Sequence, residues 1–148
     1  MSIRKLKKNR RTFIKAFFSL LLVKSLHTRL VSADEENNYL INGPLAGSIY
    51  YTKNKPGKWK NLVESHTPLL EIYKNTLKVS TLHEMKGFEH YIIKHIVLDN
   101  KFNIISEKIF DPSKDIPISK HNIMGYNDKL YILSICNQHD TWLDIIKI

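Results

Sequence analysis

The sequence predicts an all-β fold, a sandwich of two sheets with about seven strands. Short runs rich in Ile, other β-branched residues and aromatic residues recur along the chain, with turn residues between them. No stretch shows a sustained apolar period of about 3.6 residues, which argues against long amphipathic helices. The chain has a single cysteine, so no intramolecular disulfide can form, and a core between two sheets has to stabilise the domain.

The predicted strands are short and follow a polar segment at 34–38, which we expect to be a flexible tail. In chain order they span residues 48–52, 67–73, 76–82, 91–98, 102–110, 129–135 and 141–148. Between the fifth and sixth strands, D-P at 111–112 and I-P at 116–117 predict a loop. Proline has no amide hydrogen for a sheet ladder, and it restricts the residue before it. We place His121 in this loop, as a surface residue.

The length and the charge distribution limit the possible functions. The chain has 148 residues and no internal repeat, which suits one ordinary domain. Residues 1–33 hold nine Lys and Arg residues and no acidic residue, whereas residues 34–148 hold 14 Lys, no Arg and 14 acidic residues. The formal charge of residues 34–148 is therefore zero. We expect no nucleic-acid partner, because no excess of positive charge is left to neutralise phosphates.

The basic segment at the beginning of the chain reads as an export signal that covers residues 1–33. A charged region ends at Arg11, an apolar run covers residues 16–23, and V-S-A at 31–33 resembles a cleavage site. We expect cleavage after Ala33. The apolar run falls short of the roughly 20 residues that cross a bilayer. The alternatives are retention of this segment as an anchor and a basic amphipathic helix that lies on a membrane surface.

A motif within this signal indicates the export route. Residues 9–15, N-R-R-T-F-I-K, resemble the twin-arginine export motif. Proteins with this signal cross the membrane already folded, through the twin-arginine translocation machinery, often because a metal or cofactor is inserted beforehand. The resemblance implies a periplasmic protein that carries such a group.

Histidines and the single cysteine suggest a metal site. Cys136 and His139 are three residues apart directly after a predicted strand, so one turn can present both side chains to one ion. One sulfur ligand with several nitrogen ligands suits iron or copper better than a Cys-rich structural zinc site. His95 lies five residues after His90, so on a regular strand the two face opposite ways, and we expect His95 to be a packing residue. The histidines after the signal are His66, His83, His90, His95, His121 and His139.

Three segments, in the right order, resemble the superoxide reductase family, whose iron domain is shared by desulfoferrodoxin and neelaredoxin. Residues 136–142, C-N-Q-H-D-T-W, are similar to the family's C-N-x-H-G-x-W. Residues 83–98 resemble H-P-M-x-x-x-H-Y-I-x-W-I-x-L, with one extra residue between the first two histidines. Residues 64–68, E-S-H-T-P, resemble E-K-H-V-P, and W-K at 59–60 is similar to the D-W-K upstream of this motif in neelaredoxin-like members.

The resemblance implies an immunoglobulin-like β-sandwich over residues 34–148 that binds one mononuclear iron ion per chain. It assigns an axial sulfur to Cys136 and leaves the sixth coordination position open. Glu64 matches the family's glutamate that can occupy this position in the resting ferric state, so Glu64 and Cys136 are the expected catalytic residues. The resemblance assigns the four equatorial nitrogens to His66, His83, His90 and His139.

The activity implied by the resemblance is the reduction of superoxide to hydrogen peroxide at the ferrous iron. An external electron donor then reduces the iron again. For an exported protein a periplasmic cytochrome is the candidate donor. The sequence leaves the oligomeric state open, and a homo-oligomer is compatible with it.

Three departures from the family pattern keep other functions open. The family's lysine, which attracts the superoxide anion, is Ser65 here, so Lys60, Lys86 or another lysine would have to supply its charge. Asp140 replaces a glycine and places a carboxylate near the thiolate. The loop between the second and third ligand histidines is longer by one residue. The alternatives are a non-catalytic iron-binding or redox-sensing domain of the same fold and a β-sandwich interaction module whose histidines bind no metal.

Overall fold

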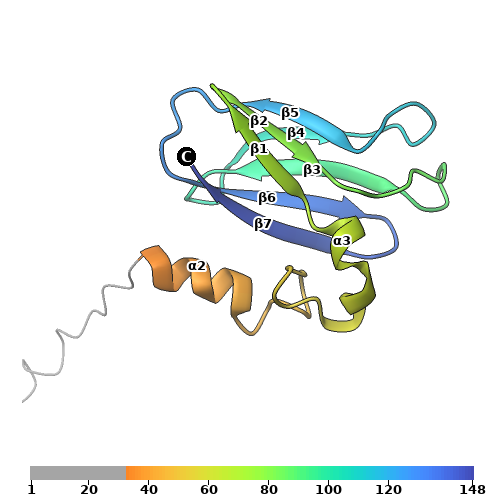
Figure 1. The fold of residues 1–148 in the computed structure, drawn as a ribbon, viewed down its shortest axis with the longest axis horizontal. Coiled ribbons are helices and arrows are strands. Elements are labelled where there is room, and N and C mark those ends of the chain that lie inside the picture. The colour runs from red at the N-terminus through yellow and green to blue at the C-terminus, as the bar shows by residue number, and fades with distance from the viewer. Residues whose placement is uncertain (1–32) are drawn as a thin grey trace, which may run out of the picture. The chain divides into compact units, whose positions relative to one another are not determined.

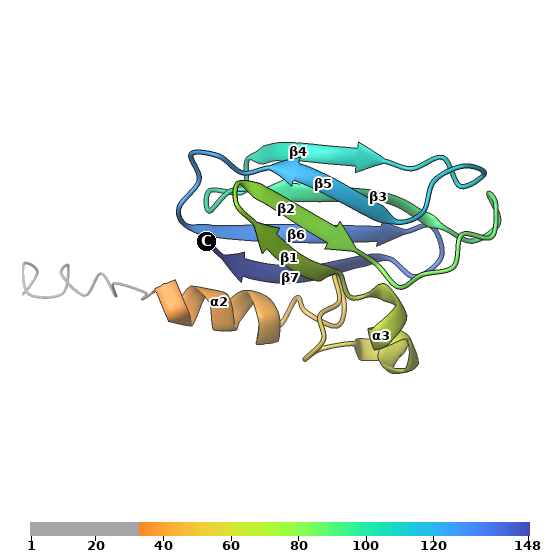
Figure 2. The same cartoon turned by 45° about the horizontal axis from the view of Figure 1, so that its top comes forward.

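Two antiparallel sheets form the frame of the computed structural model, which describes residues 33–148. The three-stranded sheet has the order β1-β2-β5, with β1 at Leu69–Tyr73, β2 at Thr76–Ser80 and β5 at Ile118–Asn122. The four-stranded sheet has the order β4-β3-β6-β7, with β4 at Ile104–Ile109, β3 at Ile92–Leu98, β6 at Lys129–Cys136 and β7 at Thr141–Lys147. The two sheets face each other (Figures 1 and 2), so the predicted seven-stranded sandwich is confirmed.

The predicted export signal lies outside the described residues, apart from its last residue, Ala33. Its motif, its cleavage site and the alternatives to it therefore stay predictions. Among residues 33–148, no helix is both long enough and apolar enough to cross a membrane.

Six of the seven predicted strands are present, and the prediction of a strand at 48–52 is wrong. This segment makes only isolated bridges, of which one joins Tyr51 to Trp142 at the edge of β7. The Tyr51 amide donates to the Thr141 carbonyl at 2.8 Å, and the Leu143 amide donates to the Tyr51 carbonyl at 2.8 Å. The segment cannot continue as a ladder because the chain turns at Gly47, whose φ is 85°, and again between Thr52 and Lys55.

Strand β5 takes the place of the second half of the predicted loop, so the surface position predicted for His121 is also wrong. Pro117 directly precedes the strand, where its missing amide hydrogen costs no ladder bond. Along β5, exposed and buried residues alternate, and the buried residues are Ser119 and His121. The strand was missed because its buried face carries polar side chains in place of apolar ones.

Within residues 33–148, three helical segments precede the sandwich. The α-helix α2 (Ala33–Asn42) replaces the expected flexible tail, and the 3-10 helix η1 (Gly57–Leu62) runs into the single turn α3 (Val63–His66). The last carbonyls of α2 find side-chain donors: the Tyr50 hydroxyl donates to Leu40 at 2.7 Å and the Thr52 hydroxyl to Ile41 at 2.9 Å. These bonds satisfy carbonyls that a helix end otherwise leaves without partners.

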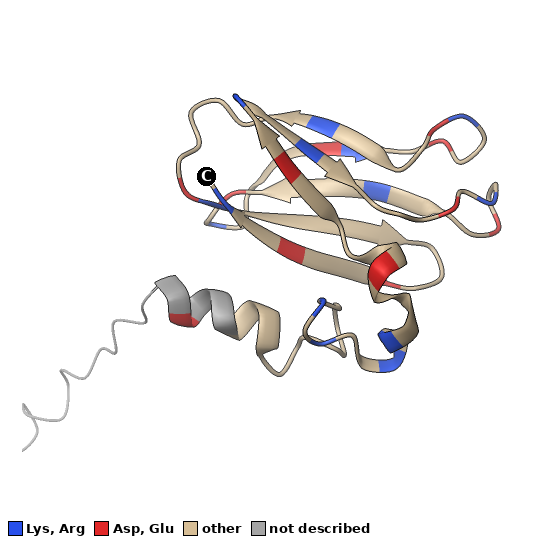
Figure 3. Ribbon diagram, in the orientation of Figure 1, with Lys and Arg blue, Asp and Glu red and all other residues tan. Residues whose placement is uncertain are grey.

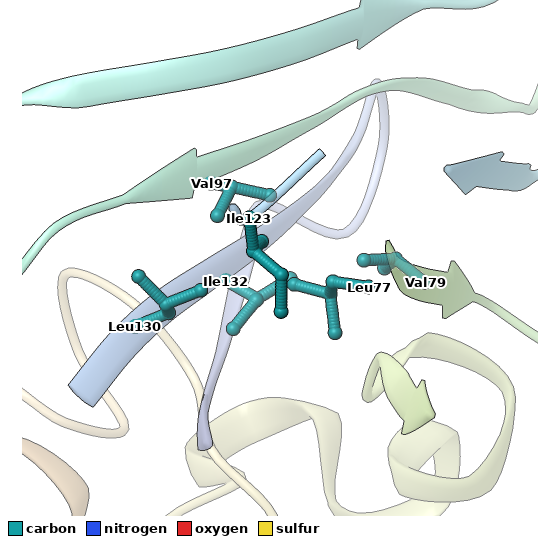
Figure 4. Packing of buried hydrophobic residues seen from close by; sticks show 6 residues of the cluster. All are labelled: Leu77, Val79, Val97, Ile123, Leu130 and Ile132. Carbon is teal, nitrogen blue, oxygen red and sulfur yellow. The ribbon is translucent and has the colours of Figure 1, made fainter. Parts of the chain in front are cut away.

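The apolar core fills the space between the two sheets. Its side chains come from β2, β3 and β6 and from the residue after β5, and they converge in Figure 4. Their burial removes apolar surface from water, which is the main favourable contribution to folding. The six residues of this cluster are Leu77, Val79, Val97, Ile123, Leu130 and Ile132.

A chain of buried polar side chains crosses the sandwich beside this core. The two nitrogens of His95, which is fully buried, lie 2.9 Å from the Thr81 hydroxyl and 2.8 Å from the Ser119 hydroxyl. Ser119 in turn lies 2.7 Å from His121, whose other nitrogen is 2.7 Å from Ser106. His95 is thus a packing residue, as predicted, and burial lowers its pKa to about 3.

Charged residues are interspersed on the described part of the chain. Figure 3 shows Lys and acidic positions alternating on the strands and loops of both sheets. Several pairs are close, including Lys78 with Glu71 at 2.9 Å and Lys94 with Glu107 at 3.1 Å. Such exposed pairs each contribute little to stability.

We predict that acid destabilises the metal-free protein partly through His95. The unfolded chain binds a proton on this ring below pH about 6.5, whereas the folded protein does so only near pH 3, so stability falls between these values. The expected loss from pH 7 to pH 4 is about 3 kcal/mol for this group. Urea unfolding at both pH values measures it, and His95→Gln should show a correspondingly smaller loss. Equal losses in both proteins would contradict the prediction.

Candidate metal centre

Five side chains predicted to bind iron lie together at one end of the sandwich. His66 ends α3, His83 follows β2, His90 precedes β3, Cys136 ends β6 and His139 lies in the β6–β7 turn. Their potential ligand atoms all lie within 4.8 Å of one another. Figure 2 shows α3 beside the end of the four-stranded sheet where β6 turns into β7. The structure thus brings together residues that are up to 73 positions apart in the sequence.

Four ring–ring contacts arrange the site histidines at the corners of an approximate square. Nδ1 of His139 lies 2.9 Å from Nε2 of His66 and 2.9 Å from Nε2 of His90. Nε2 of His90 also lies 2.9 Å from Nε2 of His83. Neighbouring rings around the square have centroids 4.4–4.8 Å apart and are nearly perpendicular. The rings of His66 and His90, at opposite corners, are 6.2 Å apart and more nearly parallel, at 27°.

Hydrogen bonds cannot satisfy this arrangement. An imidazole nitrogen has either one N–H or one lone pair, yet His139 Nδ1 and His90 Nε2 each have two nitrogens at 2.9 Å. A square with sides of 2.9 Å has its centre about 2.05 Å from each corner, which matches a metal–imidazole bond of about 2.0–2.1 Å. The residues present therefore fit a single cation bound at the centre of the four nitrogens.

The cysteine sulfur lies close to two opposite corners of this square. Sγ of Cys136 is 3.8 Å from His83 Nε2 and 3.7 Å from His139 Nδ1, which are opposite corners, so the sulfur is nearly equidistant from them. The thiol is buried beside Ile92 and Phe110, and burial raises its pKa. The Gln138 amide donates to the sulfur at 3.5 Å and opposes this rise. The sulfur completes a donor set of four nitrogens and one sulfur.

Burial keeps the site histidines neutral at physiological pH. It lowers the pKa of His66 to about 3 and that of His83 to about 4, and the neighbouring rings add to both effects. A neutral imidazole has the free lone pair that a metal ion requires. The site is thus in the protonation state that binds a cation.

Ser65 orients His66, a role that the sequence did not reveal. Nδ1 of His66 lies 2.8 Å from the Ser65 hydroxyl, and this hydroxyl donates to the Leu62 carbonyl at 3.1 Å. Since the hydroxyl hydrogen is used on Leu62, the oxygen accepts the Nδ1–H of His66. This fixes the tautomer in which the Nε2 lone pair faces the centre of the square, as outer partners of metal-binding histidines commonly do.

Asn137 joins two of the segments that carry site residues, and the sequence analysis missed this role as well. Its side-chain oxygen accepts the Tyr91 amide at 2.9 Å, and its side-chain nitrogen donates to the Glu89 carbonyl at 3.0 Å. The side chain of Gln138 donates to the same Glu89 carbonyl at 2.7 Å. These bonds hold the loop of His90 against the turn that carries the cysteine.

The structure does not bring Glu64 into the group of ligand atoms. Its side chain is exposed and borders a cavity of about 300 Å³ that Lys53 and Asp144 also line. A different cavity, of about 230 Å³, is lined by three of the site histidines together with Glu84 and Lys86. The catalytic role expected for Glu64 stays a prediction, and among the lysines that the sequence analysis named, Lys86 borders the site.

The chain resembles known proteins in structure but not detectably in overall sequence. No family model matches the chain, and no curated protein matches it. Among solved structures, a variant of the superoxide reductase (neelaredoxin) from Ignicoccus hospitalis is 21% identical, covers 69% of this chain and 94% of its own, and has a TM-score of 0.61. The chain has the fold of the superoxide reductases.

Two further superoxide reductases have similar structures. The Treponema pallidum enzyme is 24% identical, with a TM-score of 0.51 over 57% of this chain and 69% of that one. The Giardia intestinalis enzyme (1Fe-SOR) is 18% identical, with a TM-score of 0.50 over 57% of this chain and 99% of that one. Together with the group of four histidines and one cysteine, this fold supports a single iron site.

We predict that a divalent metal stabilises the protein through His90. At a free Co²⁺ concentration about 100 times its dissociation constant, the free energy of unfolding should rise by about 2.7 kcal/mol. His90→Ala should lose most of this increase, and the fold should survive the change because the ring is only half-buried. Lys78→Gln, which breaks a surface ion pair, is the control. Urea unfolding with and without Co²⁺ measures the effect, and equal stabilisation of all three proteins would contradict it.

Proposed function

We propose that this protein is an exported superoxide reductase with one iron ion bound by four histidines and one cysteine. The observation that carries the proposal is the square of imidazole nitrogens with a sulfur over two of its opposite corners. A donor set of one sulfur and four nitrogens suits iron. A structural zinc site instead has four ligands in a closed tetrahedron. The fold shared with superoxide reductases supports the same assignment.

The proposed reaction consumes one superoxide, one electron and two protons, and yields one hydrogen peroxide. When bound, iron would supply the electron, and an external donor, for which a periplasmic cytochrome is our candidate, would restore it. The four histidines and Cys136 would hold the ion, and the cavity beside three of the histidines would let a small anion approach.

Lys86 is the cation that we assign to this approach. It lines the cavity with His66, His83 and His90, and its charge adds to burial, which is the main cause of the lowered pKa of His90. Its ammonium lies 3.1 Å from the carboxylate of Glu84, and both side chains are largely exposed. An exposed cation at the mouth of a site raises the rate at which an anion is captured. Lys86 would thus replace the family lysine whose position Ser65 occupies.

A non-catalytic iron-binding or redox-sensing domain is the second candidate. The observation that favours it is the pairing of Lys86 with Glu84, which leaves little net positive charge at the cavity. Such a domain would bind the same ion but would capture superoxide slowly.

Product stoichiometry tests the proposed reaction. The iron-loaded protein, reduced anaerobically, is mixed with a superoxide source, and hydrogen peroxide and dioxygen are measured. A reductase forms one hydrogen peroxide for each superoxide and no dioxygen, and the protein becomes oxidised. Loss of superoxide at the rate seen without protein would contradict the proposal and favour the non-catalytic domain.

We predict that Lys86→Gln slows superoxide capture. At low ionic strength the rate constant should fall by about two- to fivefold, and the difference should vanish at high salt because the charge is screened. Lys120→Gln, at an exposed position on β5, is the matched control and should leave the rate unchanged. Stopped-flow absorption at several salt concentrations gives the rate constants. A rate for Lys86→Gln equal to that of the parent at low salt would show that Lys86 does not attract the anion.

For export, we predict that the two arginines of the twin-arginine motif are required. Exchange of Arg10 and Arg11 for lysine should keep the protein in the cytoplasm, with residues 1–33 still attached. Cell fractionation and mass spectrometry of the N-terminus measure both effects. Undiminished periplasmic protein that begins at Asp34 would rule out the twin-arginine route while leaving export itself in place.

A further inference from the structure

Asp140 occupies a backbone position that favours glycine, directly after the site residue His139. Its φ is 64°, a left-handed conformation that residues other than glycine adopt rarely, with Asp and Asn among the more frequent exceptions. The Asp140 carbonyl accepts the Cys136 amide at 3.0 Å and closes the β6–β7 turn. Glycine would serve this backbone role better, so the side chain of Asp140 needs a separate explanation.

The carboxylate of Asp140 is bound by two residues at the start of η1, and the Tyr51 side chain adds a further hydrogen bond. Its Oδ2 accepts the indole N–H of Trp59 at 2.9 Å and lies 3.1 Å from the ammonium of Lys58. The same ammonium lies 4.6 Å above the Trp59 ring. Trp59 departs from helical backbone geometry, with φ −102° and ψ 26°, so η1 is kinked at the residue that reaches Asp140.

The Trp59 ring also packs on the site. It meets the His139 ring edge to face, with centroids 4.6 Å apart and an angle of 78° between the planes. The His139 carbonyl accepts the indole N–H of Trp142 at 3.0 Å, which restrains the backbone of the same residue. His139 is therefore held on two sides: its ring contacts Trp59, and its neighbour in the chain, Asp140, holds the indole of Trp59 in that position.

We propose that Asp140, Trp59 and Lys58 form a latch that fixes the orientation of the His139 ring at the metal centre. Asp140 and Trp59 are then positioning residues, which act on the metal through His139 and do not touch it. The inference rests on the proposed metal site, because it assigns His139 Nδ1 as a ligand. The latch also explains why a carboxylate is tolerated next to the turn that carries Cys136. The Asp140 carboxylate is bound by Lys58 and by the indole of Trp59.

A purely structural role is the competing explanation. In that case the latch would only attach η1 to the sandwich, and its loss would lower the stability of the metal-free protein without changing metal affinity. A positioning role predicts a change in metal affinity instead, because a ring free to rotate must be ordered when the metal binds. Loss of outer partners of this kind typically weakens metal binding by about 10- to 100-fold.

The experiment compares the full chain with three variants. Asp140→Gly removes the carboxylate and suits the left-handed backbone, whereas Asp140→Asn keeps an oxygen that can accept the Trp59 N–H and removes only the charge. Glu107→Gln breaks a surface ion pair with Lys94 on the four-stranded sheet and is the control. Two quantities are measured for each protein: the Co²⁺ dissociation constant, from the thiolate-to-metal absorption during titration, and the urea midpoint without metal.

We expect Asp140→Gly to bind Co²⁺ about 10- to 100-fold more weakly than the parent protein. Asp140→Asn should restore most of the affinity, and Glu107→Gln should match the parent. An Asp140→Gly protein that binds Co²⁺ as tightly as the parent would overturn the latch, even if its urea midpoint is lower. If Asp140→Asn binds Co²⁺ as weakly as Asp140→Gly does, the hydrogen bond to Trp59 is not what restrains the His139 ring. Failure of the parent itself to bind Co²⁺ would overturn the metal site, which separates that outcome from failure of the latch.

Discussion

The structure depends on one electrostatic constraint, the convergence of four imidazole nitrogens and a sulfur on one small volume. Two of these nitrogens have two nitrogen neighbours at 2.9 Å. An imidazole nitrogen has only one lone pair or one hydrogen, so it cannot bond to both neighbours, and the nitrogens repel one another unless a cation lies between them. Burial keeps the rings of His66 and His83 neutral and therefore available to such a cation. A fold that brings these groups together from five separate places in the chain has to hold them against their mutual repulsion, and the surrounding contacts serve this purpose.

Those contacts come from both the sandwich and the segments around it. The strands provide a rigid frame, because β6 ends at the cysteine and β3 begins just after His90. Side-chain hydrogen bonds then connect the loops: Ser65 supports His66, and Asn137 ties the His90 loop to the turn after β6. The buried chain through His95 crosses the sandwich and is fully hydrogen-bonded at both rings. The burial of His95 and His121 is thus matched by hydrogen-bond partners for both nitrogens of each ring.

The sequence predicted the strands whose buried residues are apolar and missed β5, whose buried residues are polar. The runs around β3 and β6 are rich in Ile and Leu, so their pattern indicates buried strands. In β5 the inward residues are Ser119 and His121, and only the tertiary partners of these side chains explain their burial. The five site residues could be predicted from motifs, whereas the Trp59–Asp140 contact could not, because it joins residues 81 positions apart through side-chain geometry. The carboxylate that the sequence placed near the thiolate is held by Trp59 and Lys58, which no local pattern indicates.

The central claim is that the five side chains bind one iron ion through a thiolate. Its most direct test is the visible absorption spectrum of the full chain, loaded with iron anaerobically and then oxidised, together with a metal analysis of the same sample. We predict one iron per chain and a thiolate-to-ferric charge-transfer band that is absent from Cys136→Ser. A protein that binds no iron, or binds it without this band, would contradict the claim.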